Sequence, residues 1–270
     1  MELDWLQMLL LSIAQGMCGV FPLSEGGFLT ILRKLLGLSL DGSSDGLYSA
    51  MMQLAVALAV LFFFRRDWLA CLSSVSRRAI DPASRTAQRL NRRMLTLILV
   101  GAVPMALSVF ISVDFLGSLL VGAGTLILDG LVVFLSDRIG KGNRQLPETT
   151  LSDGLWIGLA QELSAVMGMS RTSLTVTAGI VRGLSPEFCF RYSFLLGGPV
   201  LLVRSCIAVL QAAGGGGFSW PYLIGMAIAG LCGYGAMHLL RWAVCRNSYS
   251  IFAYVLWGAG LFSIILYLIS

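Results

Sequence analysis

Two side chains of opposite charge stand at equivalent positions of an internal repeat. The phrase Ala-Gln-x-x-x-x-Val-x-x-x-Ser begins at Ala14 and returns at Ala160, each time within apolar sequence. The residue that follows the phrase is Glu25 in the first copy and Arg171 in the second. A lone charge in an apolar setting is costly, and two opposite charges lower each other's desolvation penalty. The repeat therefore predicts a polar site shared by two halves of the protein.

The neighbours of the arginine indicate what that site could bind. Hydroxyl side chains surround Arg171, at Ser170, Thr172, Ser173 and Thr175. A guanidinium together with hydroxyls and backbone N–H groups at a helix start is a phosphate-binding environment. The alternative is that Glu25 and Arg171 only hold the two halves together as an ion pair. Both readings stay open at the level of sequence.

Other polar residues of the two copies are weaker candidates. Gln15 and Gln161 fit interhelical hydrogen bonds, and with Gly168 they would support the site. Glu162 is the other carboxylate in a copy, and it could act as a base or a metal ligand. Asp129 lies inside an apolar segment, where pairing with a nearby arginine would neutralise it.

The composition assigns the chain to a class of protein. Apolar residues make up 57% and charged residues 12%, whereas a soluble domain carries about a quarter charged residues. Apolar runs of roughly 20 residues recur, as spanning helices require. The net charge of +5 resides in loops that flank these runs, which indicates membrane topology rather than a nucleic-acid partner. The six cysteines are scattered without a C-x-x-C motif and are expected to pack in the interior.

The sequence predicts an all-α polytopic membrane protein with six transmembrane helices and two re-entrant hairpins. The spans are expected at 48–64, 94–112, 116–135, 188–211, 221–240 and 250–269. The repeat copies are too short to cross a membrane, and each breaks at a polar, glycine-rich knot, at 22–27 and 168–173. We expect them to form helical hairpins at 5–38 and 155–181. Such breaks are tolerated only inside protein or beside a watery cavity.

Three spans separate the hairpins, so the second hairpin should have the opposite orientation. The prediction is a single membrane domain built as an inverted-topology repeat, with 1–136 and 150–270 as its halves. Such folds place their site near the membrane midplane, at broken helix ends. The basic loops should face the cytoplasm, which puts both termini on the outer face.

The motifs resemble those of the undecaprenyl-diphosphate phosphatases, the bacitracin-resistance proteins of bacterial cell-envelope synthesis. The resemblance runs nearly end to end and is carried by four stretches: Gln15-Gly16-Met-Cys-Gly19-Val-Phe21-Pro22-Leu-Ser24, Gln53-Leu-Ala55, Gly168-Met-Ser170-Arg171-Thr-Ser-x-Thr175 and Tyr192-Ser193-Phe194-Leu195-Leu196-x-x-Pro199. It implies six spans with two inverted re-entrant hairpins in the bacterial cytoplasmic membrane. It also implies a polyprenyl diphosphate substrate, which is cleaved to the monophosphate.

The chain departs from the family in the first motif, which reads E-G-x-x-E-F-x-P-V-S-S-T-G-H. The residues that stand for its two glutamates, second serine and histidine are Gln15, Gly19, Glu25 and Phe28. The second motif, P-G-x-S-R-S-x-x-T, is kept at Gly168, Ser170, Arg171 and Thr175. The phosphate-holding half is thus retained, while the residues thought to supply metal binding and the base are replaced.

Two functions follow as alternatives, with a structural or regulatory partner protein as a third. In a hydrolase, Glu25 and Glu162 would take the metal and base roles beside Ser24, with Mg²⁺ or Ca²⁺ as the ion. In a non-hydrolytic transporter, flippase or binder, the site would hold a polyprenyl phosphate or another amphipathic anion. The sequence leaves the oligomeric state open, with a homodimer as one option.

Overall fold

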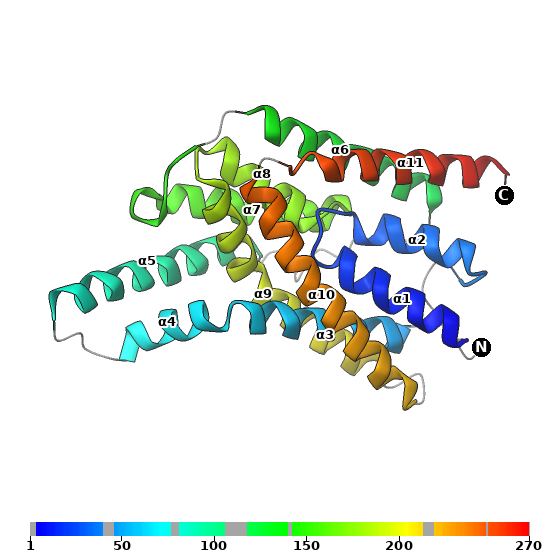
Figure 1. Ribbon diagram of the computed structural model, residues 1–270, viewed down its shortest axis with the longest axis horizontal. Coiled ribbons are helices and arrows are strands. Elements are labelled where there is room, and N and C mark those ends of the chain that lie inside the picture. The colour runs from blue at the N-terminus through cyan, green and yellow to red at the C-terminus, as the bar shows by residue number, and fades with distance from the viewer. Residues whose placement is uncertain are drawn as a thin grey trace.

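The computed structural model describes residues 4–39, 46–76, 81–105, 118–139, 142–212, 219–246 and 248–269. Its helices follow the chain as α1 (Trp5–Cys18), α2 (Glu25–Leu35), α3 (Gly46–Phe63), α4 (Arg65–Ser76), α5 (Pro82–Met105), α6 (Leu119–Arg138), α7 (Leu151–Met167), α8 (Arg171–Val181), α9 (Pro186–Ala212), α10 (Pro221–Cys245) and α11 (Ile251–Ile269), with a short 3₁₀ turn at Leu146–Glu148 before α7. The molecule is elongated. The α4–α5 arm projects at one end, and both chain termini lie at the other (Figure 1).

Five of these helices are long and apolar enough to cross a membrane, namely α3, α6, α9, α10 and α11. They coincide with five of the predicted spans. The remaining prediction, 94–112, falls on the second half of α5, and its residues from 106 onward lie outside the described part. The first half of α5 carries exposed arginines, so this helix extends past the apolar region. The chain is therefore an all-α, multi-pass membrane protein.

The two repeat copies form helical hairpins, as predicted. The pair α1–α2 breaks between Cys18 and Glu25, and the pair α7–α8 breaks between Met167 and Arg171. At 1.5 Å per residue, the 14 residues of α1 extend about 21 Å, and the hydrocarbon core is about 30 Å thick. Helix α1 is therefore too short to cross the hydrocarbon core of a membrane.

Local sequence explains where the helices break. Gly168 has φ +68°, a left-handed conformation that suits glycine and ends α7. Ser24 and Ser170, the last residues of the repeated phrase, are the N-caps of α2 and α8. Their hydroxyls accept hydrogen bonds from the backbone N–H groups of Gly27 and Ser173. The same phrase therefore produces the same stop and restart in both halves.

Helices of one half of the chain pack mainly against helices of the other half. Helix α1 packs on α10, and α7 packs on α5, while α3 pairs with α9 and α6 with α11. Small residues allow the close approach. A Cβ added at Gly158 in α7 would lie 2.1 Å from the carbonyl oxygen of Gly101 in α5. A Cβ at Gly16 in α1 would lie 2.5 Å from that of Ala229 in α10. The residue limits 1–136 and 150–270 remain predictions.

Matching tyrosines fasten the two halves in similar ways. Tyr48 of α3 donates a hydrogen bond to the carbonyl of Met8 in α1 (2.7 Å), and Tyr192 of α9 donates one to Leu97 in α5 (2.7 Å). Both rings are fully buried. Each tyrosine thus ties the central α3–α9 pair to a neighbouring helix and fixes the frame around the hairpins.

Candidate functional site

The tips of the two hairpins touch and are hydrogen-bonded to each other. Ser24 of the first tip donates to the carbonyl of Gly168 in the second (2.9 Å). Ser170 of the second tip donates to Phe21 of the first (3.4 Å). Thr172 donates to Val20 (3.0 Å). The structure therefore brings Ser24, Ser170 and Thr172 together, although their copies of the phrase are far apart in sequence.

Asp129 of α6 is hydrogen-bonded to the second hairpin tip. Its carboxylate is fully buried and accepts hydrogen bonds from the backbone N–H of Ser170 (2.8 Å) and the hydroxyl of Ser173. The arginine partner expected from the sequence is not found among the described residues, because the tip itself supplies the donors. Asp129 thereby fixes the start of α8, where Arg171 stands. An aspartate inside an apolar span was the signal, but sequence did not identify its partners.

The hydroxyls around Arg171 are largely committed within the protein. Ser170 and Thr172 donate across to the first hairpin, Ser173 donates to Asp129, and Thr175 donates to the carbonyl of Arg171 (2.7 Å). A hydroxyl has a single proton to donate. In this arrangement these side chains shape the site, and the guanidinium of Arg171 is the main group able to donate to an anion.

Arg171 borders a narrow pocket, with an accessible volume of about 20 Å³, between the hairpins and the central helix pair. Both hairpins and helices α3 and α9 contribute to its lining, with Gly19, Val60, Gln161, Arg171, Thr172, Thr175, Ser193, Phe194, Gly197, Gly198 and Leu201. The paired glycines of α9 leave the space that side chains would fill. Of the predicted site residues, Arg171, Thr172, Thr175 and Gln161 meet here.

Ser193 is a pocket residue that sequence reasoning did not select. It lies on α9, and its hydroxyl oxygen is buried without a hydrogen-bond partner. An unsatisfied buried polar atom costs about 1–3 kcal/mol. Its signal was the Tyr-Ser dipeptide, which follows both hairpins at 48–49 and 192–193. An orphaned hydroxyl in a pocket wall suggests that a ligand completes it.

Glu25 is held by amides rather than by the arginine. Its carboxylate accepts hydrogen bonds from the side-chain N–H groups of Gln15 and Gln53, the latter at 3.0 Å. Arg171 lies within electrostatic range of Glu25, and no ion pair joins the two in the described structure. Gln53 was quoted in the family resemblance, but its role emerged only here. The two amides orient the carboxylate, and within the described part of the chain no carboxylate forms an ion pair with the Arg171 guanidinium.

Glu162 and the side chains that could hold a metal ion complete the description of the site. Glu162 of α7 and Glu25 of α2 are both partly buried, and neither lines the pocket. Glu25 lies within electrostatic range of Arg171, which does line it. Within the described ranges, no group of three histidine, cysteine or acidic side chains is placed to hold a metal ion. Mg²⁺ is commonly bound through one or two carboxylates plus substrate phosphates. An ion at this site would therefore rest on Glu25 and on the phosphates of a bound substrate.

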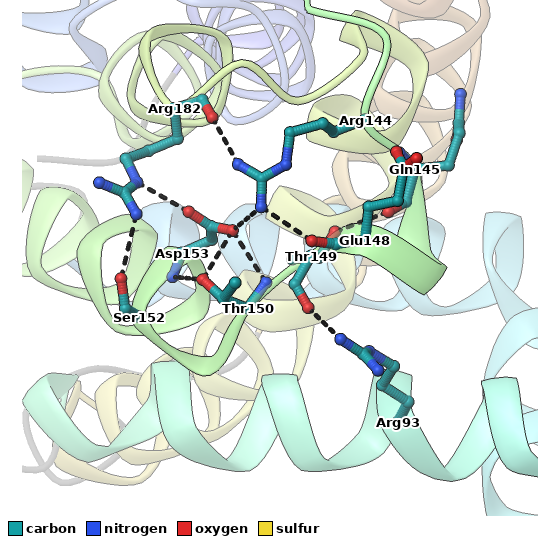
Figure 2. A network of polar contacts seen from close by, with 9 residues as sticks. All are labelled: Arg93, Arg144, Gln145, Glu148, Thr149, Thr150, Ser152, Asp153 and Arg182. Atoms are coloured by element: carbon teal, nitrogen blue, oxygen red, sulfur yellow. Dashed lines mark hydrogen bonds and ion pairs between the residues drawn. The ribbon is translucent and has the colours of Figure 1, made fainter.

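A buried carboxylate also anchors the base of the second hairpin (Figure 2). Asp153 accepts hydrogen bonds from Arg144 and Arg182, each at 2.7 Å, and from the backbone and hydroxyl of Thr150. Burial raises the pKa of Asp153, but these hydrogen bonds outweigh it and bring the pKa down to about 2. The sequence suggested only loop charges here. The network joins the first turn of α7 to the end of α8.

Comparison with known proteins agrees with this architecture. The family described as "Bacitracin resistance protein BacA" matches residues 8–262. Similar proteins include "Undecaprenyl-diphosphatase 2" of Corynebacterium jeikeium, 32% identical, covering 93% of this chain and 92% of the relative. "Undecaprenyl-diphosphatase" of Carboxydothermus hydrogenoformans is 29% identical, covering 96% of each. With the family matched across nearly the whole chain, this protein belongs to the bacitracin resistance protein BacA family.

Proposed function

We propose that the chain binds a polyprenyl diphosphate in the pocket between its hairpins, with Arg171 as the principal anion donor. The observation that carries this is the guanidinium itself, which lines the pocket and has no ion pair with Glu25. A guanidinium recognises phosphate oxygens bidentately. The unsatisfied hydroxyl of Ser193 on α9 adds a second donor to the pocket lining. The printed names of the relatives, undecaprenyl-diphosphatases, support this class of lipid.

Hydrolysis of the bound diphosphate is the first function we propose for this site. Water attacks the terminal phosphorus, and the bond from that phosphorus to the bridging oxygen breaks. The polyprenyl monophosphate departs with the bridging oxygen, and the terminal phosphorus is released as inorganic phosphate. Glu25 accepts the proton of the attacking water, because the amides of Gln15 and Gln53 orient its carboxylate. Arg171 offsets the charge that develops on the phosphoryl oxygens. A Mg²⁺ or Ca²⁺ ion, when bound at Glu25, would add further charge neutralisation.

Phosphate release from undecaprenyl diphosphate by the purified protein tests this proposal. Arg171→Lys keeps the charge but loses the fork of donors, so release should fall about 10- to 100-fold. Glu25→Gln should reduce release by about 10²- to 10⁴-fold, as expected for the loss of a base. Arg89→Lys and Glu148→Gln are matched controls on exposed positions and should leave release unchanged. If Glu162→Gln abolishes release while Glu25→Gln does not, Glu25 is not the base.

A non-hydrolytic lipid carrier is the second candidate, and the lack of a serine nucleophile together with the replaced side chains of the first motif favours it. The hydroxyl of Ser24 is fully buried and donates to Gly168, so it cannot attack a substrate in the pocket. Gly19 and Phe28 also offer no ligand or base where the resembling family has them. A carrier would release no phosphate, yet Arg171→Ala would weaken binding of labelled polyprenyl phosphate and slow its movement across proteoliposomes. Binding that is unaffected by Arg171→Ala would exclude both functions at this site.

We further propose that the protein resides in the bacterial cytoplasmic membrane with both termini on the outer face. The α4–α5 arm carries a dense set of arginines at the end of the molecule opposite the termini (Figure 1). Basic segments face the cytoplasm in such membranes. In this orientation the network around Asp153 belongs to the cytoplasmic face, and the first hairpin opens outward.

A further inference from the structure

A second polar pocket lies where α3 passes into α4, beside the start of α9 and the end of α10. It is broad and open, with an accessible volume of about 470 Å³. It shares no lining residue with the hairpin pocket, and nothing in the proposed function uses it. Four arginines, two carboxylates and five aromatic side chains line it: Phe63, Phe64, Arg65, Arg66, Asp67, Glu187, Phe190, Arg191, Tyr234, His238 and Arg241.

The rim of this pocket carries an excess of positive charge. Asp67 pairs with Arg191, and Glu187 pairs with Arg241 at 2.9 Å. Arg65 stacks over the ring of Phe62 at 4.2 Å, and it has no carboxylate partner in the described part of the chain. Arg66 is exposed and likewise has none there. Two guanidinium groups therefore stand uncompensated at the mouth.

Arg191 adds an uncommitted donor to the same wall. Its Nε is buried and lacks a hydrogen-bond partner, although its terminal nitrogen pairs with Asp67. Buried donors of this kind are normally satisfied. The pocket thus combines unpaired positive charge with an unused N–H group, which are the features that bind phosphate oxygens.

Aromatic side chains in contact with one another form part of the pocket lining, which we call its floor. The ring of Phe63 meets Tyr234 and His238 edge-on at 5.6 Å and 4.9 Å, and Phe64 packs against Phe190 at 5.8 Å. The apolar helix α3 ends at Phe63, and the polar helix α4 begins at Arg65. A basic rim above an aromatic floor at the end of a spanning helix matches a lipid whose headgroup is anionic and whose chains are apolar.

We propose that this pocket binds an anionic phospholipid of the surrounding leaflet. Arg65 and Arg66 hold the headgroup phosphate, and the first methylenes of the acyl chains rest against Phe63 and Tyr234. The site is separate from the one between the hairpins, so the proposal holds whether or not that site hydrolyses a diphosphate. A zwitterionic lipid would meet the same floor but would place its own cation against the arginines.

Lipid titration of the purified full-length protein, followed by native mass spectrometry, tests this proposal. Phosphatidylglycerol should bind, and phosphatidylcholine of the same chain length should bind more weakly. Each arginine near a headgroup contributes about fivefold in affinity, so Arg65→Gln with Arg66→Gln should weaken phosphatidylglycerol binding about thirtyfold. The matched control is Arg85→Gln with Arg89→Gln, which removes equal charge from the exposed face of α5 and should leave binding unchanged.

Three results would overturn the site. Equal weakening by both double variants would mean diffuse surface attraction rather than a pocket. Equal binding of the two lipids would remove the headgroup requirement. Displacement of the lipid by inorganic phosphate at comparable concentration would show a site for a free anion. The substituted residues Arg65, Arg66, Arg85 and Arg89 are solvent-exposed. Unchanged melting temperatures of both variants would confirm that folding is intact.

Discussion

Asp129 lies in the middle of an apolar helix, and its carboxylate receives hydrogen bonds from the second hairpin tip. The sequence showed that this aspartate needed a partner, yet it suggested a cation. A polar group in an apolar segment can be recognised locally, but its partner depends on how helices align in three dimensions. The same reason explains why Gln15 was expected to make an interhelical hydrogen bond, as it does, while its partner was not identified. Glu25, the group it binds, lies beyond a chain reversal.

We expect Asp129→Ala to destabilise the protein, because it leaves the N–H of Ser170 and the hydroxyl of Ser173 without their buried acceptor. Each such loss costs about 1–3 kcal/mol. Asp129→Asn keeps one carbonyl oxygen and should recover part of the difference. Thermal unfolding in detergent measures both variants. Equal melting temperatures for Asp129→Ala and the unsubstituted protein would contradict the role assigned here.

The helical elements could be anticipated with more success than their contacts. Both hairpin breaks can be predicted from local signals that end or start a helix, namely glycine, proline and an N-cap serine. The five spans follow from length and hydropathy. The interlocked tips could not be read from the chain, since they depend on two breaks meeting at one depth. The family resemblance fixed the architecture and the retained Arg171 motif, but not which hydroxyls remain free.

Close packing between α7 and α5 leads to a prediction about Gly158. A methyl group there would lie 2.1 Å from the backbone oxygen of Gly101, so Gly158→Ala must push the helices apart. Overpacking of this kind costs about 1–3 kcal/mol. Gly235 in α10 is the matched control, because a Cβ there meets nothing within 4 Å. The melting temperature should fall for Gly158→Ala only, and an equal fall in both variants would refute the packing argument.

The base of the second hairpin should make stability depend on pH in an acidic window. The pKa of Asp153 is lowered to about 2 when folded, against an unfolded value of about 3.9. Its contribution is therefore complete above pH of about 4 and is lost as the pH falls toward 2. Asp153→Asn should lower stability at neutral pH and flatten the decline across this window. Asp81→Asn serves as the comparison, since it removes an exposed carboxyl whose pKa is also lowered by Ser84.

At the scale of the whole molecule, the two ends differ in charge, and this difference sets the proposed orientation. The arginine-bearing arm and the chain termini lie at opposite ends (Figure 1). Both the lipid pocket and the Asp153 network involve arginines of the kind that collects on the cytoplasmic side.

Labelling of single cysteines tests this orientation. In a variant with its six native cysteines replaced by serine, Asp4→Cys should react with a membrane-impermeant maleimide in intact spheroplasts. Arg85→Cys, on the α4–α5 arm, should react only after permeabilisation. The reverse pattern would place the basic arm outside and overturn the proposed topology.

The crossed hydrogen bonds at the hairpin tips limit how often the two hairpins can separate. Three hydroxyls, those of Ser24, Ser170 and Thr172, donate from one tip to the other. At about 1 kcal/mol net each, they favour the joined state by about 3 kcal/mol, so separated tips would be populated about once in 150 molecules. Neither hairpin tip can move away from the other without breaking the hydrogen bonds that join them. Movement of one hairpin is therefore coupled to the position of the other.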